Sequence, residues 1–156
     1  MQTVVIYDSK FGNTETIAQA IGRGLSALGD VRVMSTGEAT LTERPDLLLL
    51  GGPTQNHGAS RGLREFMDAL PAVLRGVPVA MFDTRYRGST WLTGSAAEKA
   101  AKAIRKAGGD VVAEPESFFI VRKGPMERQT LESGEIERAE QWAAAVAAAA
   151  NEGRQS

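Results

Sequence analysis

The stretch Val4-Val5-Ile6-Tyr7-Asp8-Ser9-Lys10-Phe11-Gly12-Asn13-Thr14-Glu15-Thr16-Ile17-Ala18 decides the fold of this chain. It opens with a short apolar run, which predicts a strand over residues 3–8, and continues as a loop of small and polar residues. Apolar residues then recur at helical spacing, which predicts a helix over residues 14–28. A strand, a polar loop and a helix N-terminus form an anion site, because the first-turn N–H groups have no partners inside the helix.

The loop in this stretch suits a phosphate group. Ser9, Asn13 and Thr14 add side-chain donors to the backbone amides. Neither the glycine pattern of dinucleotide-binding folds nor that of P-loop NTPases occurs in the chain. The loop therefore points away from NAD and ATP and toward a mononucleotide. An ordinary strand-to-helix turn with a good N-cap is the alternative explanation of the same pattern.

Length and composition exclude several classes of function. The 156 residues suit one domain, predicted over residues 1–150, with a frayed tail over 151–156. The chain has no cysteine and one histidine, which excludes disulfides, iron–sulfur ligation and a multi-histidine metal site within it. A net charge of −1 argues against a nucleic-acid surface. Met1 leads directly into a strand and no apolar run is long enough to span a bilayer, so a cytoplasmic protein is expected.

Strand and helix patterns alternate along the whole chain. Further strands are predicted over residues 31–34, 46–50 and 77–82, with a last strand in two pieces over 111–112 and 118–121. Further helices are predicted over residues 61–74 with a break at Pro71, 96–107 and 135–150, and one helical turn over 40–44. This alternation predicts an α/β fold with a doubly wound, five-stranded parallel sheet of order 2-1-3-4-5. Ligands bind such sheets at the carboxyl ends of the strands, in the loops after strands one, three and four.

The second of these loops follows the third predicted strand and contains Gly51 and Gly52, which let the backbone approach a flat ligand closely. Thr54 and Asn56 supply groups that hydrogen-bond to ring edges or to a sugar-like chain. We expect this loop to contribute Pro53, Thr54, Gln55, Asn56, His57 and Gly58 to a ligand site.

These two loops resemble those of flavodoxin-like FMN domains, and most of all the flavodoxin module of flavodiiron proteins. The resemblance rests on Ser9-Lys10-Phe11-Gly12-Asn13-Thr14 and on Pro53-Thr54-Gln55-Asn56-His57-Gly58, where His57 replaces an asparagine that is usual in that module. It implies a three-layer α/β/α fold that binds FMN without a covalent bond and performs redox work through it. It also implies that a backbone carbonyl among Asn56, His57 and Gly58 accepts a hydrogen bond from the reduced flavin.

The third loop follows the fourth predicted strand and matches the family less clearly. In flavodoxins this loop supplies an aromatic side chain that stacks on the flavin ring. Here the loop offers two aromatic candidates, of which Tyr86 is slightly favoured over Trp91, since Trp91 also suits a role in covering the next helix. The residues expected to contact the cofactor in this loop are Thr84, Arg85, Tyr86, Gly88 and Trp91.

Basic residues fall in or just after all three loops, namely Lys10, His57, Arg61, Arg85 and Arg87. Typical flavodoxins have an acidic rim, so a basic rim predicts an anionic partner. The partner would be an acidic redox protein or an NAD(P)H-dependent reductase. The same side chains would instead extend into solvent if they steer nothing.

The sequence leaves three functions open. The first is an electron carrier that moves single electrons between proteins, which the short third loop favours. The second is an FMN-dependent NAD(P)H or quinone oxidoreductase, which the basic rim and weak net charge favour. The third is a flavodoxin-like domain that binds no flavin, because Lys10 and Phe11 stand where other flavodoxins have hydroxyl residues.

Overall fold

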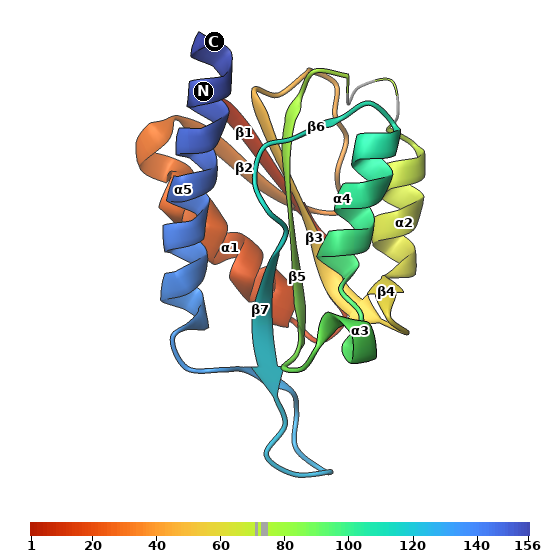
Figure 1. The fold of residues 1–156 in the computed structure, drawn as a ribbon. Coiled ribbons are helices and arrows are strands. Elements are labelled where there is room, and N and C mark those ends of the chain that lie inside the picture. Colours follow the sequence, from red (N-terminus) through yellow and green to blue (C-terminus); the bar gives the residue numbers. More distant parts are fainter. Residues whose placement is uncertain (71, 73–74) are drawn as a thin grey trace.

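Five parallel strands form the centre of the sheet in the computed structural model, which describes residues 1–70, 72 and 75–156 (Figure 1). They lie in the order β2-β1-β3-β5-β7, and each pairs in parallel with its neighbour. Their bounds are Gln2–Tyr7 for β1, Asp30–Ser35 for β2, Leu47–Gln55 for β3, Pro78–Tyr86 for β5 and Glu116–Val121 for β7. This order is the predicted order 2-1-3-4-5, so the doubly wound fold is confirmed.

Three two-residue strands extend this sheet. Strand β6, Asp110–Val111, pairs with β5 beside β7, so the last strand does come in two pieces. Strand β4, Gly58–Ala59, folds back on β3, and β8, Thr130–Leu131, folds back on β7, both antiparallel. Neither β4 nor β8 was predicted, because two residues are too few to show an alternating pattern.

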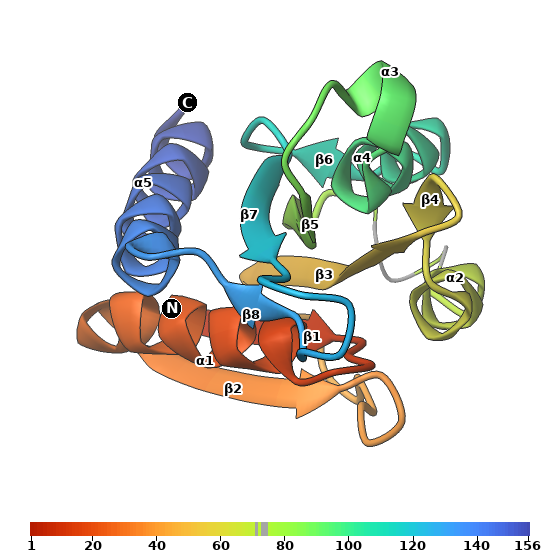
Figure 2. The same cartoon turned by 90° about the horizontal axis from the view of Figure 1, so that it is seen from below.

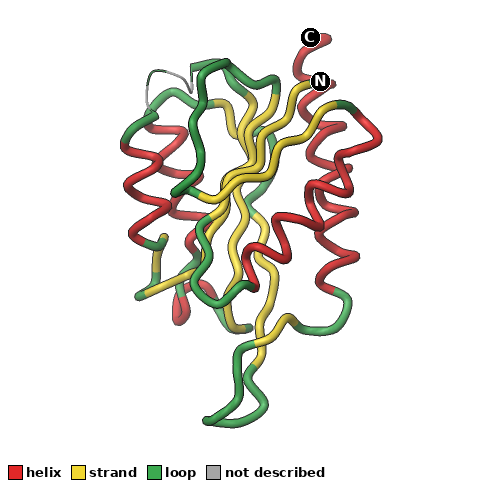
Figure 3. Tube along the Cα trace, turned by 180° about the vertical axis from the view of Figure 1, so that it is seen from behind, coloured by secondary structure: helices red, strands yellow, loops and turns green. Residues whose placement is uncertain are grey.

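Two helical layers cover the sheet, as Figures 1 and 3 show. Helix α1, Asn13–Leu25, continues into the short 3-10 helix Ser26–Leu28, and it packs with α5, Glu135–Gln155, on one face. Helices α2, Arg61–Asp68, and α4, Ala96–Lys106, cover the other face. The short helix α3, Thr90–Thr93, precedes α4.

The strands are buried on both faces, and this explains their uninterrupted apolar runs. In β3, Leu49 belongs to the core under α1 and α5, whereas its neighbours Leu48 and Leu50 belong to the core under α2 and α4. The alanine-rich helix α5 contributes Ala139 and Ala143 to the first of these cores, as expected for a helix that packs on the sheet.

Several predicted element bounds were wrong. Residues 40–44 form no helical turn, because Arg44 precedes Pro45 and a residue before proline avoids the helical conformation. Helix α2 ends at Asp68, short of the predicted break at Pro71, and the predicted end at Leu74 lies outside the described residues, as does Pro71. Helix α5 continues to Gln155 instead of ending at Ala150. Within the described residues, no helix combines the length and apolarity needed to cross a membrane.

Candidate flavin site

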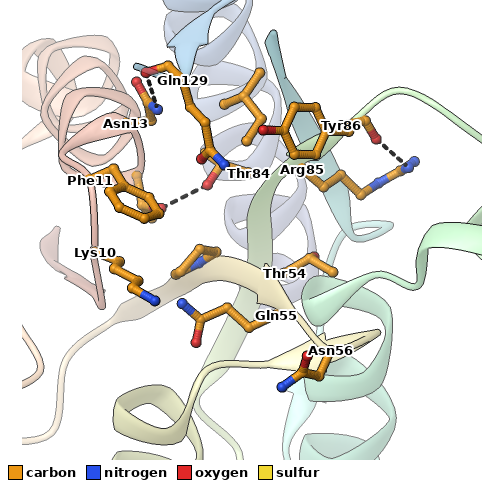
Figure 4. Close-up of a pocket in the computed structure, with 13 residues that line it drawn as sticks. Lys10, Phe11, Asn13, Thr54, Gln55, Asn56, Thr84, Arg85, Tyr86 and Gln129 are labelled. Carbon is orange, nitrogen blue, oxygen red and sulfur yellow. Dashed lines mark hydrogen bonds between the residues drawn. The ribbon is translucent and has the colours of Figure 1, made fainter. Parts of the chain in front are cut away.

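A cavity of about 310 Å³ lies where β1, β3 and β5 end (Figure 4). Eleven of the residues predicted for the ligand site line it, and two further residues join them. The predicted ones are Lys10, Phe11, Asn13, Thr14, Pro53, Thr54, Gln55, Asn56, Thr84, Arg85 and Tyr86; the others are Ile120 and Gln129. The structure therefore brings all three predicted loops to one cavity.

The loop between β1 and α1 leaves the helix N-terminus open. Gly12 is the N-cap with φ +90°, a left-handed conformation that glycine adopts without strain, and within the described residues no side chain caps the helix. The N–H of Gly12 donates to Oγ of Ser9 at 3.1 Å, so these two residues shape the loop and do not line the cavity. The first-turn N–H groups that begin at Asn13 are thus available to an anion.

Side chains join this loop to distant parts of the chain. The hydroxyls of Thr14 and Thr84 lie 2.8 Å apart in a buried hydrogen bond, which ties α1 to the end of β5. Nδ2 of Asn13 donates to the carbonyl oxygen of Gln129 at 3.1 Å (Figure 4). The positions of the first and third loops are therefore coupled, and the segment before β8 closes the same side of the cavity.

The second loop is a tight hairpin. Strand β3 continues through Gly51 and Gly52 to Gln55, and Gln55 pairs with Gly58 of β4. Between them Asn56 has φ +46° and His57 has φ +64°, and two successive residues with positive φ are the mark of a type I′ turn. Gln55 and Asn56 line the cavity, whereas Gly58 and the exposed His57 do not. His57 and Gly58 thus lie outside the lining of the cavity, and their contacts with a ligand stay a prediction.

The structure places the two aromatic candidates of the third loop in different surroundings. Strand β5 continues through Thr84 and Arg85 to Tyr86, which lines the cavity and is 42% exposed. Trp91 lies on α3, is 87% exposed and does not line the cavity. Gly88 also lies outside the lining, and its carbonyl oxygen accepts a hydrogen bond from Nη1 of Arg85 at 3.1 Å. Of the two aromatic candidates in the third loop, Tyr86 is therefore the one that lines the cavity.

A buried carboxylate holds the second and third loops together. Asp83 is fully buried, and its Oδ2 accepts hydrogen bonds from Oγ1 of Thr54 at 3.0 Å and Oγ of Ser95 at 2.6 Å. The same oxygen accepts from the N–H of Ala97 at 3.0 Å, in the first turn of α4. Its Oδ1 has no hydrogen-bond partner among the residues that the structure describes and lies 4.0 Å from Nε of Arg85. Asp83 thus fixes Thr54 at the cavity wall by anchoring it to the start of α4.

The predicted basic rim is wrong at Arg85. This side chain is buried, donates to Oγ of Ser117 at 2.9 Å and faces the ring of Phe119. Arg61 and Arg87 are exposed but paired, Arg61 with Glu65 at 2.7 Å and Arg87 with Glu132 at 2.8 Å. Strand β5 runs to Tyr86, four residues beyond the predicted end at residue 82, so Arg85 lies within a strand and not in a loop.

Sequence reasoning missed Ile120 and Gln129. Ile120 is the penultimate residue of β7, and Gln129 precedes β8. The site prediction covers only the loops after strands one, three and four, although Arg122-Lys123-Gly124-Pro125 is a turn-like sequence that follows the last predicted strand. This turn-like sequence is the signal that could have indicated this wall of the cavity.

Solved structures of the same architecture span nearly the whole chain. A flavodoxin from the domain Archaea superposes with a TM-score of 0.78 at 23% identity, covering 97% of this chain and 99% of that one. The oxidised flavodoxin 1 of Bacillus cereus gives 0.76 at 22% identity, with coverages of 94% and 97%. Rubredoxin oxygen:oxidoreductase of Desulfovibrio gigas gives 0.74 at 17% identity, and the match covers 96% of this chain but 36% of that enzyme. These TM-scores establish a shared fold.

A search of curated protein sequences returns no match to this chain. The family comparison is decisive, because the sequence model described as flavodoxin matches residues 5–142, most of the chain. The matched region includes all three loops around the cavity. This chain belongs to the flavodoxin family.

Proposed function

We propose that this protein binds FMN in the 310 Å³ cavity and carries electrons to and from redox partner proteins. One observation carries the proposal: an uncapped helix N-terminus opens onto a cavity whose other walls include an aromatic ring and a backbone hairpin. The donors on the α1 side are backbone amides and hydroxyls with a single cation, Lys10, which suits a phosphate monoester. FMN supplies the capacity to accept and release electrons, and the protein supplies binding, orientation and electrostatics.

Each wall of the cavity has a separate task in this proposal. The loop from Ser9 to Thr14 binds the phosphate through first-turn N–H groups. Tyr86 stacks on the ring, and stacking of this kind contributes about 0.5–1.5 kcal/mol beyond the buried area. Gln55 and Asn56, at the tip of the β3–β4 hairpin, offer polar groups to the ring edge. A backbone carbonyl of that turn remains the proposed acceptor for the reduced flavin.

Titration of the flavin-free protein with FMN, followed by fluorescence, tests binding. We expect Tyr86→Ala to weaken FMN binding by about tenfold or more, because it removes both stacking and buried area. Trp91→Ala is the matched control, since it removes an aromatic ring that does not line the cavity. Equal losses for the two variants, or no binding by the unchanged protein, would contradict the proposed site.

A reductive titration with dithionite tests the redox role. An electron carrier should take up its two electrons in two separate one-electron steps, seen as a distinct spectrum at half reduction. A single two-electron step, coupled to oxidation of NAD(P)H with quinone as acceptor, would instead support the oxidoreductase.

A further inference from the structure

Beside Lys10, further positive charge near the cavity lies on a segment that the sequence analysis did not single out. The loop between β7 and β8, residues 122–129 and here called the basic loop, contains Arg122, Lys123 and Arg128 against the single acid Glu127. All three cations are exposed. In the described part of the chain, no carboxylate oxygen lies within 4.0 Å of their charged nitrogens.

The basic loop adjoins the flavin cavity. Figure 1 shows it projecting beyond the end of the sheet, and Figure 2 shows it beside the loop that precedes α1. Between the two segments lies a second cavity of about 530 Å³, which shares Lys10, Phe11 and Gln129 with the first. Whatever occupies the second cavity therefore contacts the residues that enclose the first.

The surface around the second cavity has an apolar centre. Met126 at the tip of the basic loop is 96% exposed, and Phe11 on the facing segment is 64% exposed. Pro125 is also exposed and lines the same cavity. Nζ of Lys10 lies 5.3 Å from the centroid of the Phe11 ring, which places a cation at the edge of this apolar group. Exposed apolar side chains with a mainly basic surround, here four cations against Glu127, are typical of a binding surface.

We propose that the basic loop and the adjoining Lys10–Phe11 segment dock an acidic one-electron carrier protein, whose carboxylates surround an apolar patch beside its redox centre. This inference rests on the proposed electron-carrier function and names the partner class. A protein fits this surface better than a small anion does. The tip of the basic loop projects outward, so Met126 is placed to contact another broad surface and not a ligand enclosed beneath the loop. The loop charges steer the encounter, and Phe11 with Met126 supplies the apolar contact.

The probe is an acidic plant-type [2Fe–2S] ferredoxin, labelled and followed by fluorescence anisotropy, with both flavin-free and FMN-loaded protein. Ionic strengths of about 20 mM and about 500 mM bracket weak and strong screening. The test variant is Arg122→Glu with Lys123→Glu and Arg128→Glu, none of which lines the first cavity. We expect its affinity to fall by about a hundredfold at low salt and by less than about fivefold at high salt.

The matched control reverses three exposed cations remote from the loop, Arg32, Lys102 and Arg105, so the net charge changes equally. Equal losses for the two triple variants, or no complex with the unchanged protein at low salt, would overturn the proposal. Met126→Ala should weaken binding by about fivefold or more while leaving the salt dependence unchanged.

Two further measurements separate this proposal from its competitors. The competing ligands are NADPH and vesicles rich in anionic lipid. If the basic-loop variant lost binding of either one and kept its ferredoxin binding, the proposal would be overturned. FMN affinity is measured on every variant. If the unchanged protein does not bind FMN, the proposed carrier function is wrong. If the basic-loop variant binds both FMN and ferredoxin as the unchanged protein does, only the proposed docking surface is wrong.

Discussion

Gly94 controls how closely the segment before α4 approaches the β3–β4 hairpin. It has φ +71°, and a Cβ placed on it would lie 2.5 Å from Cα and the carbonyl oxygen of His57. We expect Gly94→Ala to displace the Asn56–His57 turn and to weaken FMN binding by about tenfold or more, equal to about 1.4 kcal/mol. A fluorescence titration with FMN measures this loss.

Gly108 offers a matched control for that substitution. It has φ +85°, so alanine there meets the same backbone strain of about 1–2 kcal/mol, but a Cβ would have nothing within 4 Å. Gly108→Ala should lower the stability through this strain alone and leave the FMN affinity unchanged. If both variants bound FMN as the unchanged protein does, the contact between Gly94 and His57 would not shape the cavity.

Individual side chains show where sequence reasoning succeeds. Thr14 and Thr54 were predicted at the site because polar residues follow buried strands, and both line the cavity. The burial of Arg85 was missed because it depends on Asp83, Ser117 and Phe119, which neighbouring strands and positions supply only after folding. The two-residue turn was missed because Asn56-His57 lacks the glycine that usually marks it.

Helix α5 is held to the sheet by a charged first turn. Glu135 is buried, and its Oε2 accepts hydrogen bonds from the N–H of Phe119 at 2.7 Å and from Nη2 of Arg138 at 2.6 Å. Burial by itself would raise the pKa of Glu135, but the hydrogen bonds from Arg138 and Phe119 lower that pKa below its ordinary value. The ionised carboxylate therefore stabilises the contact between α5 and β7.

We expect Glu135→Gln to lower the free energy of unfolding at neutral pH by about 1–3 kcal/mol. Because the folded-state pKa is lowered, the contribution of Glu135 is complete above its unfolded pKa of about 4.3 and is lost as the pH falls below it. The difference in stability between the two proteins should thus shrink on acidification. Urea unfolding across this pH range measures it, with the exposed Glu137→Gln as control. A difference that stays constant with pH would contradict the role of the ionised carboxylate.

Long elements were predictable and short ones were not. Strands β1, β3 and β5 are buried on both faces, so their apolar runs stand out in the sequence. Strands β4 and β8 arise from tertiary pairing of two residues each, which leaves no periodic signal. Gln129, which directly precedes β8 in the wall of the cavity, was therefore missed, whereas Asn56 beside β4 was predicted from its polar side chain.

For the molecule as a whole, cofactor binding should stabilise the folded state by mass action. At an FMN concentration about a hundred times its dissociation constant, the gain is about 2.7 kcal/mol, which raises the melting temperature by roughly 5–10 °C. Riboflavin is the control ligand, because it lacks the phosphate that the N-terminus of α1 is proposed to bind. An equal rise with riboflavin at the same concentration would show that the phosphate loop adds nothing to binding.

The hydrogen bond between Asn13 and Gln129 has a consequence for biosynthesis. It joins two residues that are 116 positions apart, so one side of the flavin cavity comes from the start of the chain and another from near its end. At about 5–20 residues per second, a ribosome needs roughly 6–23 s to add the intervening segment. A nascent chain in that interval lacks the wall that Gln129 provides, and so cofactor capture at this cavity follows translation of most of the polypeptide.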